Sequence, residues 1–572
     1  MRIIGDYKPN HKPYTISSMK AYFTGFLDLM PDSIGYHIPG NMNGLWFPPV
    51  RALKNIYILN GNEIVKPKRV ILYSSGIEFH NDDLLLKFWF DKNSIFRIKI
   101  NSMKNYNIEL IMELMPLNTW FSINDTRILE KKHLITISSQ MFTDTRIKIR
   151  TGNPFILKDG ILKIDVKKSS EVEIYNYFNI NNKIPVNNYN DINRFSVLKS
   201  EGNMPRNFTM AKENLIRLSM IIPGIGYGLT AGQPDFPWYF GIDSMLSING
   251  MLYSGFFNLA RGSLNILARF SRSGKIPHEI LQSGKIYNDG DLEETALYPY
   301  AVFRYIKFSW NLKENLHLIK TAGESFNYIM EHGYSGRGIM EDPGAGSGID
   351  IDTITFTIMS LKELMDFKNC DNEEILNMID VLNPGEKIDG LKKIINNFWL
   401  NEKKTFANRI IDNTPYDHGF WTSILPFYSN LATNNQYRMF ADYNGGLSSM
   451  KSDSGIMIDR SGNTMPLNTG MFLIAAAAYG DSENALYCLE KLNNSFERFS
   501  PGSYPEISNN SRGCFLQAWS GSLYIESIAS GIFGIKIENG RPVSSPLKNH
   551  GLGHARLEKL RFGSVLYNFN LY

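Results

Sequence analysis

The fold class is decided by the stretch LSINGMLYSGFFNLARGSLNILARF, residues 246–270, in which apolar side chains recur at helical spacing. Residues 208–220 show the same period shortly before it. Further helical patterns lie at residues 292–310, 312–331, 353–366, 372–380, 386–400, 419–433, 466–479, 482–496 and 515–530. We therefore expect the chain beyond about residue 206 to be mostly helix.

The chain before residue 206 has a different pattern. Brief β-branched and aromatic runs are separated by Asn, Gly and Asp, which is typical of strands joined by turns. Such runs lie at residues 56–59, 69–73, 84–90, 96–100 and 171–175. The length of 572 residues also favours more than one core. We expect a multidomain α+β chain, with a β-sandwich domain at residues 1–205 and a helical domain at 206–572.

Composition excludes several classes of protein. Hydrophobic residues make up 43% and charged residues 20%, the balance of a globular protein. The 60 basic and 56 acidic residues form no long basic block, so we expect no nucleic-acid partner. No apolar run reaches the roughly 18 to 20 residues of a membrane span, so we expect no membrane partner. Only three cysteines and no apolar N-terminal leader point to a cytoplasmic protein.

One candidate catalytic residue is Asp243, which stands between the aromatic cluster 236–240 and a long apolar stretch. Apolar surroundings raise the pKa of a carboxyl group, which then stays protonated near neutrality and can donate to a leaving oxygen. Asp is also a favoured helix N-cap, so a purely structural role is an open alternative. The pattern makes Asp243 a candidate general acid.

A second candidate is Glu506, which lies between Pro505 and a β-branched residue just before an apolar stretch. A carboxylate held rigidly in this way can deprotonate a water molecule. The alternative is an ordinary acidic residue on a surface loop. The pattern makes Glu506 a candidate general base.

Two further patches have the residue types that bind sugars, whose faces stack on aromatic rings and whose hydroxyl groups need polar partners. One runs from His278 to Glu294, and the other from Tyr416 to Trp421. Charging of a helix N-terminus is an alternative for the acids of the first patch. The candidate substrate-binding residues are Trp238, Tyr239, His278, Tyr287, Asn288, Asp291, Glu294, Asp417, His418, Trp421, Gln517 and Trp519.

Several motifs of other enzyme classes are missing from the sequence. It contains no Gly-Lys-Ser/Thr phosphate loop, no His-Glu-x-x-His helix and no Gly-x-Ser-x-Gly elbow between a strand and a helix. The Gly-rich stretch 338–348 follows no clear strand, so we expect a flexible active-site loop rather than a dinucleotide site. We expect neither a metal nor an organic cofactor.

Three segments together resemble the amylo-α-1,6-glucosidase part of glycogen debranching enzymes. The segment 237–247, PWYFGIDSMLS, is similar to that family's Pro-Trp-Phe and Trp-Gly-Arg-Asp-Thr motifs. Residues 273–277 followed by 287–291 look like its Gly-x-Ile-Pro, Tyr-Asn and Asp-Ala segments. Residues 505–507 followed by 512–520 are similar to its Glu-Ile, Gly-Cys and Gln-Ala-Trp-Ser run. The resemblance covers roughly residues 206–535.

The resemblance implies an (α/α)6 toroid, a double ring of six inner and six outer helices, behind a β-sandwich. It also implies an inverting, exo-acting glycoside hydrolase, with Asp243 as acid and Glu506 as base, acting on α-1,6- or α-1,4-linked glucose of an oligosaccharide or glucan. Ile242 stands where the family has Arg, and Phe240 where it has Trp, so the substrate is open. Trehalases, glucoamylases and processing glucosidases or mannosidases are alternatives, as are a phosphorolytic enzyme and a non-catalytic carbohydrate-binding protein on the same barrel.

Overall fold

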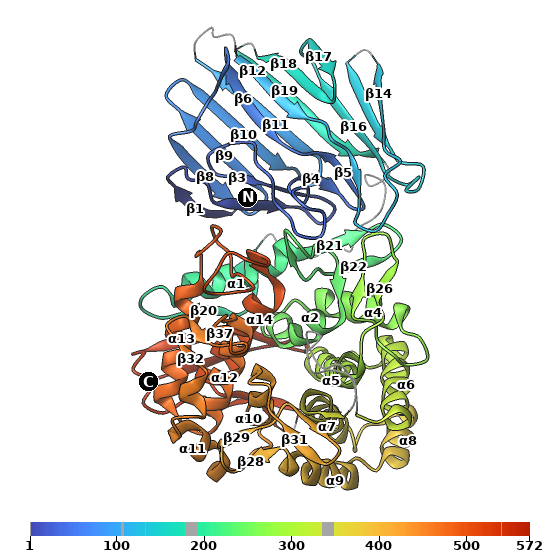
Figure 1. Cartoon of the computed structure of the whole chain (residues 1–572), viewed down its shortest axis with the longest axis vertical. Helices are drawn as coiled ribbons and strands as arrows, with labels where there is room; N and C mark the ends of the chain where they lie inside the picture. Colours follow the sequence, from blue (N-terminus) through green and yellow to red (C-terminus); the bar gives the residue numbers. More distant parts are fainter. Residues whose placement is uncertain are drawn as a thin grey trace.

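The computed structural model describes residues 2–103, 108–131, 133–166, 168–177, 191–334, 348–538 and 540–572. A part built of β-sheets, up to Asn176, lies against a part built mainly of helices, from Met204 onward (Figure 1). We refer to them as the β-rich part and the helical part. The predicted change from strands to helices is confirmed.

The β-rich part consists of three antiparallel sheets. The largest has the order β1-β8-β9-β10-β11-β19-β16-β15-β14, and the two smaller ones have the orders β17-β18-β12-β6-β7 and β13-β5-β4-β3-β2. The strands of the largest sheet are Ile3–Tyr7, Arg69–Tyr73, Gly76–Asn81, Leu84–Phe90, Phe96–Ser102, Ser169–Asn176, Arg146–Thr151, Leu134–Ser138 and Arg127–Lys131, in that order. Those of the smaller sheets are Phe155–Lys158, Ile161–Val166, Ile108–Glu113, Ile56–Asn60 and Glu63–Ile64, then Leu117–Asn118, Val50–Leu53, Gly44–Phe47, Tyr22–Phe26 and Pro13–Ser17.

The large sheet packs face to face on the smaller ones. Phe23 of β3 contacts Phe88 of β10 and Phe96 of β11, with ring centroids 5.7 and 5.4 Å apart. In β10 and β11 alternate residues are buried, as expected when one face of a strand lies on a core. The β-rich part therefore has its own apolar core between two layers.

Among the described residues, one ring of helices closes on itself in the helical part. Helix α3 contacts α5, α5 contacts α7, α7 contacts α10, α10 contacts α12, α12 contacts α14, and α14 contacts α3. All residues of α14 are buried, which is typical of a helix surrounded by others. The ring segments are α2 and α3 (Gly241–Leu246, Ile248–Tyr253), α5 (Leu292–Ser309), α7 (Ile351–Met365), η4 and α10 (Trp421–Ile424, Leu425–Tyr428), α12 (Pro466–Ala478) and α14 (Ala518–Glu526).

Other helices pack on the outside of this ring. Helix α4 (Phe257–Phe270) contacts α3 and α5, α6 (Leu316–His332) contacts α5, α9 (Pro384–Asn397) contacts α7, α13 (Ser482–Ser495) contacts α12, and α1 (Met204–Leu218) contacts α14. Helix α11 (Asn434–Asp442) packs Phe440 on Phe427 of α10. Because ring and outer helices alternate along the chain, the ring helices share one direction. The loops that precede them meet at one end of the ring.

The structure corrects two sequence expectations about the helical part. The stretch 246–270 is not one helix, because the chain turns at Gly255, whose φ is +75°. The last residues form strands β35 (Ile535–Glu538), β36 (Arg541–Ser544), β37 (Ala555–Phe562) and β38 (Val565–Leu571), which the helical pattern did not predict. Strand β37 also pairs with β20 (Val197–Lys199), so the end of the chain lies beside the start of the helical part.

Polar contacts join the two parts. The guanidinium of Arg217 in α1 donates to the backbone oxygen of Thr15 in β2 at 2.9 Å, and Ile221 N donates to Met19 O at 2.7 Å. A small apolar cluster also crosses the boundary, with Met42 packed near Trp238 and Leu281. Of the helices in the described ranges, none has the length and apolar character needed to cross a bilayer.

Candidate active site

A cavity of about 700 Å³ lies at the end of the ring where the ring helices begin. Both candidate catalytic carboxylates line it, Asp243 from the first turn of α2 and Glu506 from the loop before α14. The lining residues are Tyr36, His37, Trp120, Ala231, Phe236, Phe240, Ile242, Asp243, His278, Glu279, Tyr287, Asn288, Glu506, Gln517 and Trp519. We call it the carboxylate cavity.

Asp243 is almost fully buried in the wall of this cavity, with 4% of its surface exposed. Its Oδ1 atom accepts a hydrogen bond of 2.8 Å from Nε2 of Gln517. Burial raises the pKa of Asp243 to about 8, helped by the charge of Glu506 and opposed by the charge of His278. At neutral pH the carboxyl group therefore holds a proton that it can donate.

Glu506 is held by the backbone of its own loop. Its amide donates to Cys514 O at 2.8 Å, and the Cys514 amide donates to Glu506 Oε2 at 2.9 Å. Gly513 has a φ of +76°, and a Cβ atom there would lie 2.5 Å from Glu506 Oε2. Burial raises the pKa of Glu506 to about 7. The hydrogen bond from the Cys514 amide opposes this rise, and the charge of Asp235 adds to it. The carboxylate form is thus available near neutrality.

A buried ion pair stands beside Asp243. His278 Nδ1 is hydrogen-bonded to Glu294 Oε1, whose side chain is fully buried. Burial lowers the pKa of His278, but the Glu294 carboxylate outweighs this effect, and the pKa rises to about 9. The imidazole is therefore a cation at neutral pH. Nearby, Trp238 Nε1 donates to Glu279 Oε1 at 2.7 Å, which fixes another carboxyl group of the cavity.

Within the described ranges, His278, Glu293 and Glu294 form a group whose potential ligand atoms lie within 4.8 Å of one another. The Glu294 carboxylate already pairs with His278. Burial and the neighbouring carboxylates of Glu294 and Asp352 raise the pKa of Glu293 well above its ordinary value. The His278–Glu294 ion pair therefore holds this group together, and burial disfavours the charged form of Glu293.

The structure brings part of the predicted substrate-binding set to the carboxylate cavity. His278, Tyr287, Asn288, Gln517 and Trp519 line it. Trp238 does not line the cavity but lies behind its wall, stacked on Trp120 with ring centroids 5.9 Å apart. Trp238 therefore supports the aromatic wall of the carboxylate cavity.

Six other predicted contacts do not line this cavity. Tyr239 is a core residue whose hydroxyl lies 2.8 Å from Met220 O. Asp291 and Glu294 form the capping box of α5, so the alternative stated for this patch, a role at the N-terminus of a helix, applies to them. The remaining three residues lie at a different loop. Asp417 lines a separate cavity of about 270 Å³, His418 is the next residue in the sequence, and the side chain of Trp421 is fully buried. The predicted active-site loop 338–348 lies outside the described residues except for Gly348.

The residues that sequence reasoning missed come from both parts: Ala231, Phe236, Phe240, Ile242 and Glu279 belong to the helical part, and Tyr36, His37 and Trp120 to the β-rich part. Tyr36, His37 and Trp120 line the carboxylate cavity, so the β-rich part supplies one of its walls. Trp120 also contacts Tyr287 of the helical part, with ring centroids 4.5 Å apart. The available signal was aromatic residues inside polar, Gly-rich or Asn-rich loops, as at residues 35–44 and 116–125.

No protein-family model and no curated protein matches this sequence. Solved structures do match the fold. A chain named "Putative kojibiose phosphorylase from human microbiome" is similar with a TM-score of 0.64 and 12% identity, over 97% of this chain and 91% of that one.

Two further solved structures are similar over most of this chain. A bacterial glucoamylase complexed with acarbose has a TM-score of 0.57 and 13% identity, over 93% of this chain and 94% of its own. A sialidase has a TM-score of 0.51 and 10% identity, over 86% of this chain and 59% of its own. The protein therefore shares the fold of these structures, with strands in its N-terminal part and helices in its C-terminal part.

Proposed function

We propose that the protein is an inverting, exo-acting glycoside hydrolase in which Asp243 is the general acid and Glu506 the general base. The architecture that fits best is a β-sandwich in front of an (α/α)6 toroid. Its six ring segments and the outer helices on them correspond to the inner and outer helices of such a toroid. The loops before the ring helices then form the active site.

One observation carries this proposal: the carboxyl groups of Asp243 and Glu506 line one cavity, and burial raises the pKa of Asp243 to about 8 and that of Glu506 to about 7. Asp243, with the higher pKa, keeps the proton that the leaving oxygen needs. Glu506, with the lower pKa, is the group that loses its proton first and can activate a water. An oxocarbenium-like transition state attacked by this water gives inversion.

The lining of the cavity supports a neutral sugar as substrate. Trp519, Trp120 and Tyr287 offer aromatic faces, and Asn288, Gln517 and Glu279 offer polar groups for hydroxyls. Under the resemblance to amylo-α-1,6-glucosidases, we propose a terminal α-linked glucose of an oligosaccharide. Ile242 and Phe240, the two residues that differ from the amylo-α-1,6-glucosidase motif, line the same cavity. The preferred linkage is therefore the property that we expect to differ most from that family.

Phosphorolysis is the second candidate, because one of the similar structures is named as a phosphorylase. A phosphorolytic enzyme binds a phosphate dianion where a hydrolase activates water. Here Glu506 occupies the cavity with a carboxylate that would repel phosphate, and this favours hydrolysis.

The test is incubation with maltose, isomaltose, panose, trehalose, kojibiose, limit dextrin and mannose-linked substrates, with and without inorganic phosphate. We expect free sugar of inverted anomeric configuration, followed by NMR, at a rate that phosphate does not change. Formation of a sugar phosphate would establish phosphorolysis. No turnover of any substrate, together with binding of one of them, would support the non-catalytic alternative.

A further inference from the structure

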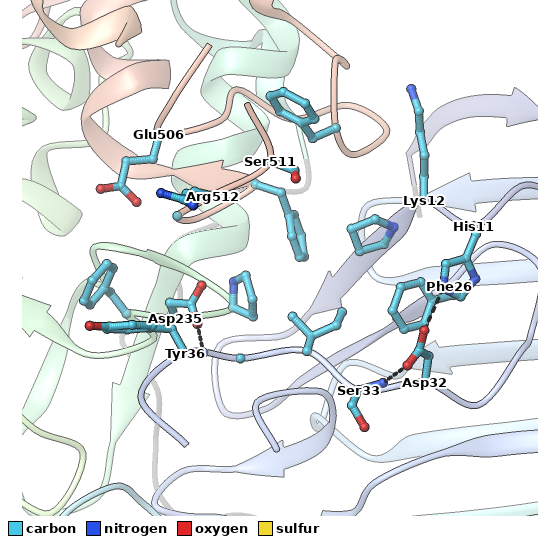
Figure 2. A pocket seen from close by; sticks show the side chains of 18 of the residues that line it. His11, Lys12, Phe26, Asp32, Ser33, Tyr36, Asp235, Glu506, Ser511 and Arg512 are labelled. Atoms are coloured by element: carbon cyan, nitrogen blue, oxygen red, sulfur yellow. Dashed lines mark hydrogen bonds and ion pairs between the residues drawn. The ribbon is translucent and has the colours of Figure 1, made fainter. Parts of the chain in front are cut away.

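A second cavity, of about 850 Å³, adjoins the carboxylate cavity. Tyr36, Phe236 and Glu506 line both cavities, so the two are neighbours across Glu506. Figure 2 shows Glu506 and Asp235 on the helical side of the second cavity and His11 on the β-rich side. We call it the interpart cavity, because each part of the chain supplies one wall.

The two carboxyl groups of the proposed mechanism differ in their relation to the interpart cavity. Glu506 lines both cavities, whereas Asp243 lines only the carboxylate cavity. An inverting hydrolase protonates the leaving oxygen on one face of the sugar and activates a water on the opposite face. The interpart cavity therefore adjoins the group that activates the water, and not the group that protonates the leaving oxygen.

The lining of the interpart cavity extends from the protein surface to Glu506. Ser511 and Arg512 are exposed. Asp235, by contrast, is 7% exposed, and its Oδ1 atom accepts a hydrogen bond of 2.7 Å from Tyr36 N. The Asp235 carboxyl lies close enough to Glu506 for its charge to raise the pKa of Glu506. The cavity therefore connects solvent with the surroundings of the proposed base.

The interpart cavity has the size and the polar groups that water needs. A water molecule takes up ~30 Å³, a small fraction of the 850 Å³ of this cavity. Charged groups of both signs lie in the lining, so neither anions nor cations are concentrated there. The polar side chains available to water are those of His11, Lys12, Asp32, Ser33, Asp235, Arg498, Ser511 and Arg512.

Resting on the proposed function, we infer that the interpart cavity is the entrance through which the attacking water reaches Glu506, separate from the cavity that holds the sugar. In each turnover the oxygen of this water forms a bond to the anomeric carbon, and one of its protons passes to Glu506. The bond from the anomeric carbon to the leaving oxygen breaks, and that oxygen takes the proton of Asp243. The interpart cavity supplies the water while the substrate fills the carboxylate cavity.

Azide is the probe for this entrance, because its concentration can be varied and its product identifies the nucleophile. Glu506→Gly removes the side chain that lies between the two cavities. On a glycosyl fluoride we expect this variant to lose about 1,000-fold in hydrolysis. Azide should restore turnover at least about tenfold. Its nitrogen bonds to the anomeric carbon as fluoride ion leaves, which gives the glycosyl azide of inverted configuration.

Ser511→Cys in the Glu506→Gly background provides a removable plug. Ser511 is exposed and lines the interpart cavity but not the carboxylate cavity. Labelling of the introduced thiol with a benzyl methanethiosulfonate should lower the azide-dependent rate about tenfold or more, and dithiothreitol should restore it. The KM for the fluoride should stay within about twofold, because the sugar enters elsewhere.

The matched control is Ser448→Cys in the same background, an exposed serine that lines neither cavity, which also reports any reaction at the native cysteines. An azide-dependent rate that labelled Ser511→Cys retains, or that labelled Ser448→Cys loses equally, overturns the inference. Absence of the glycosyl azide in both Glu506→Gly and Glu506→Ala also overturns it, while hydrolysis by the wild type stands. No turnover of any glycoside or fluoride by the wild type refutes the proposed function instead.

Discussion

Nε2 of Gln517 lies 2.8 Å from Oδ1 of Asp243 and donates a hydrogen bond to it. Gln517 is the residue just before α14, and Asp243 lies in the first turn of α2, so this bond joins the starts of two neighbouring ring helices. Both side chains are buried and both line the carboxylate cavity. The bond therefore fixes the direction in which the proposed acid presents its proton.

Gln517→Leu should keep the fold and lower kcat by about 10- to 100-fold, because a catalytic group that shifts by about 1 Å loses activity on that scale. The matched control is Gln282→Leu, another buried glutamine, whose Nε2 donates to Pro237 O. It removes a buried hydrogen bond outside the cavity lining and should lower Tm with little effect on kcat. Equal effects of the two variants on kcat would contradict the positioning role of Gln517.

Gly513→Ala places a methyl group 2.5 Å from Glu506 Oε2 and strains a backbone with φ of +76°. We expect kcat to fall about 100-fold as Glu506 is displaced. Gly540→Ala separates the two effects, since its φ is +71° and its Cβ meets nothing within 4 Å. Both variants should lose about 1 kcal/mol of stability, but only the first should lose activity. Thermal unfolding and initial rates measure the two effects.

The pH profile of kcat/KM should be a narrow bell. Below about pH 7 Glu506 is protonated and cannot accept a proton from water, which sets the acidic limb. Above about pH 8 Asp243 has lost the proton that the leaving group needs, which sets the basic limb. Because the two groups interact, the limbs report macroscopic values of the pair. A profile that keeps rising to pH 10 is incompatible with Asp243 as acid.

Asp235→Asn tests the origin of the acidic limb. The charge of Asp235 adds to burial in raising the pKa of Glu506, so its removal should move the acidic limb to lower pH and leave the basic limb in place. Asparagine can still accept the hydrogen bond from Tyr36 N. Asp32→Asn, in the same interpart cavity but paired with His11, is the control and should move neither limb.

Trp120→Ala tests the contribution of the β-rich part to the site. The ring of Trp120 contacts those of Trp238 and Tyr287 at the wall of the carboxylate cavity. Its loss should raise KM about tenfold, the effect of an aromatic contact of about 1 kcal/mol or slightly more. Trp310→Ala, at a half-exposed tryptophan outside both cavities, should leave KM unchanged. An unchanged KM in Trp120→Ala would make the β-rich wall purely structural.

Period alone predicted the two-part organisation, because helices and strands repeat their buried positions every 3.6 and 2 residues. The strands at 84–90 and 96–102 and the outer helix at 316–332 followed that rule, whereas the ring helices at 292–309 and 466–478 are buried on almost all sides. The C-terminal strands were not predicted, because the segment Arg556 to Leu560 contains a register shift, which breaks the alternation that marks a strand.

The carboxylates were found in the sequence because each lies in a short local segment next to a ring helix. Their shared cavity could not be predicted from spacing, since Asp243 and Glu506 meet only when the ring closes through α14 and α3. The wall formed by Tyr36, His37 and Trp120 is still less predictable. It depends on how one part of the chain docks on the other, and no local pattern encodes that contact.

Local pattern did not distinguish residues of the carboxylate cavity from residues of the same types elsewhere. The segment Asp417 to Trp421 has the same residue types as a sugar site, yet it lies at a separate, smaller cavity, with the Asp417 carboxylate bonded to Lys403 at 2.7 Å. Tyr239 points into the core, whereas Phe240, the next residue of the same short strand, lines the carboxylate cavity, since successive residues of a strand face opposite ways.

The most direct test of the account compares Asp243→Asn and Glu506→Gln on a natural glycoside and on a glycosyl fluoride, whose leaving group needs no protonation. On the natural substrate both variants should lose about 1,000-fold or more in kcat, while circular dichroism shows an intact fold. On the fluoride Asp243→Asn should recover most of its activity and Glu506→Gln should not. Recovery in Glu506→Gln alone, or wild-type rates in either variant on the natural substrate, would contradict the assignment of acid and base.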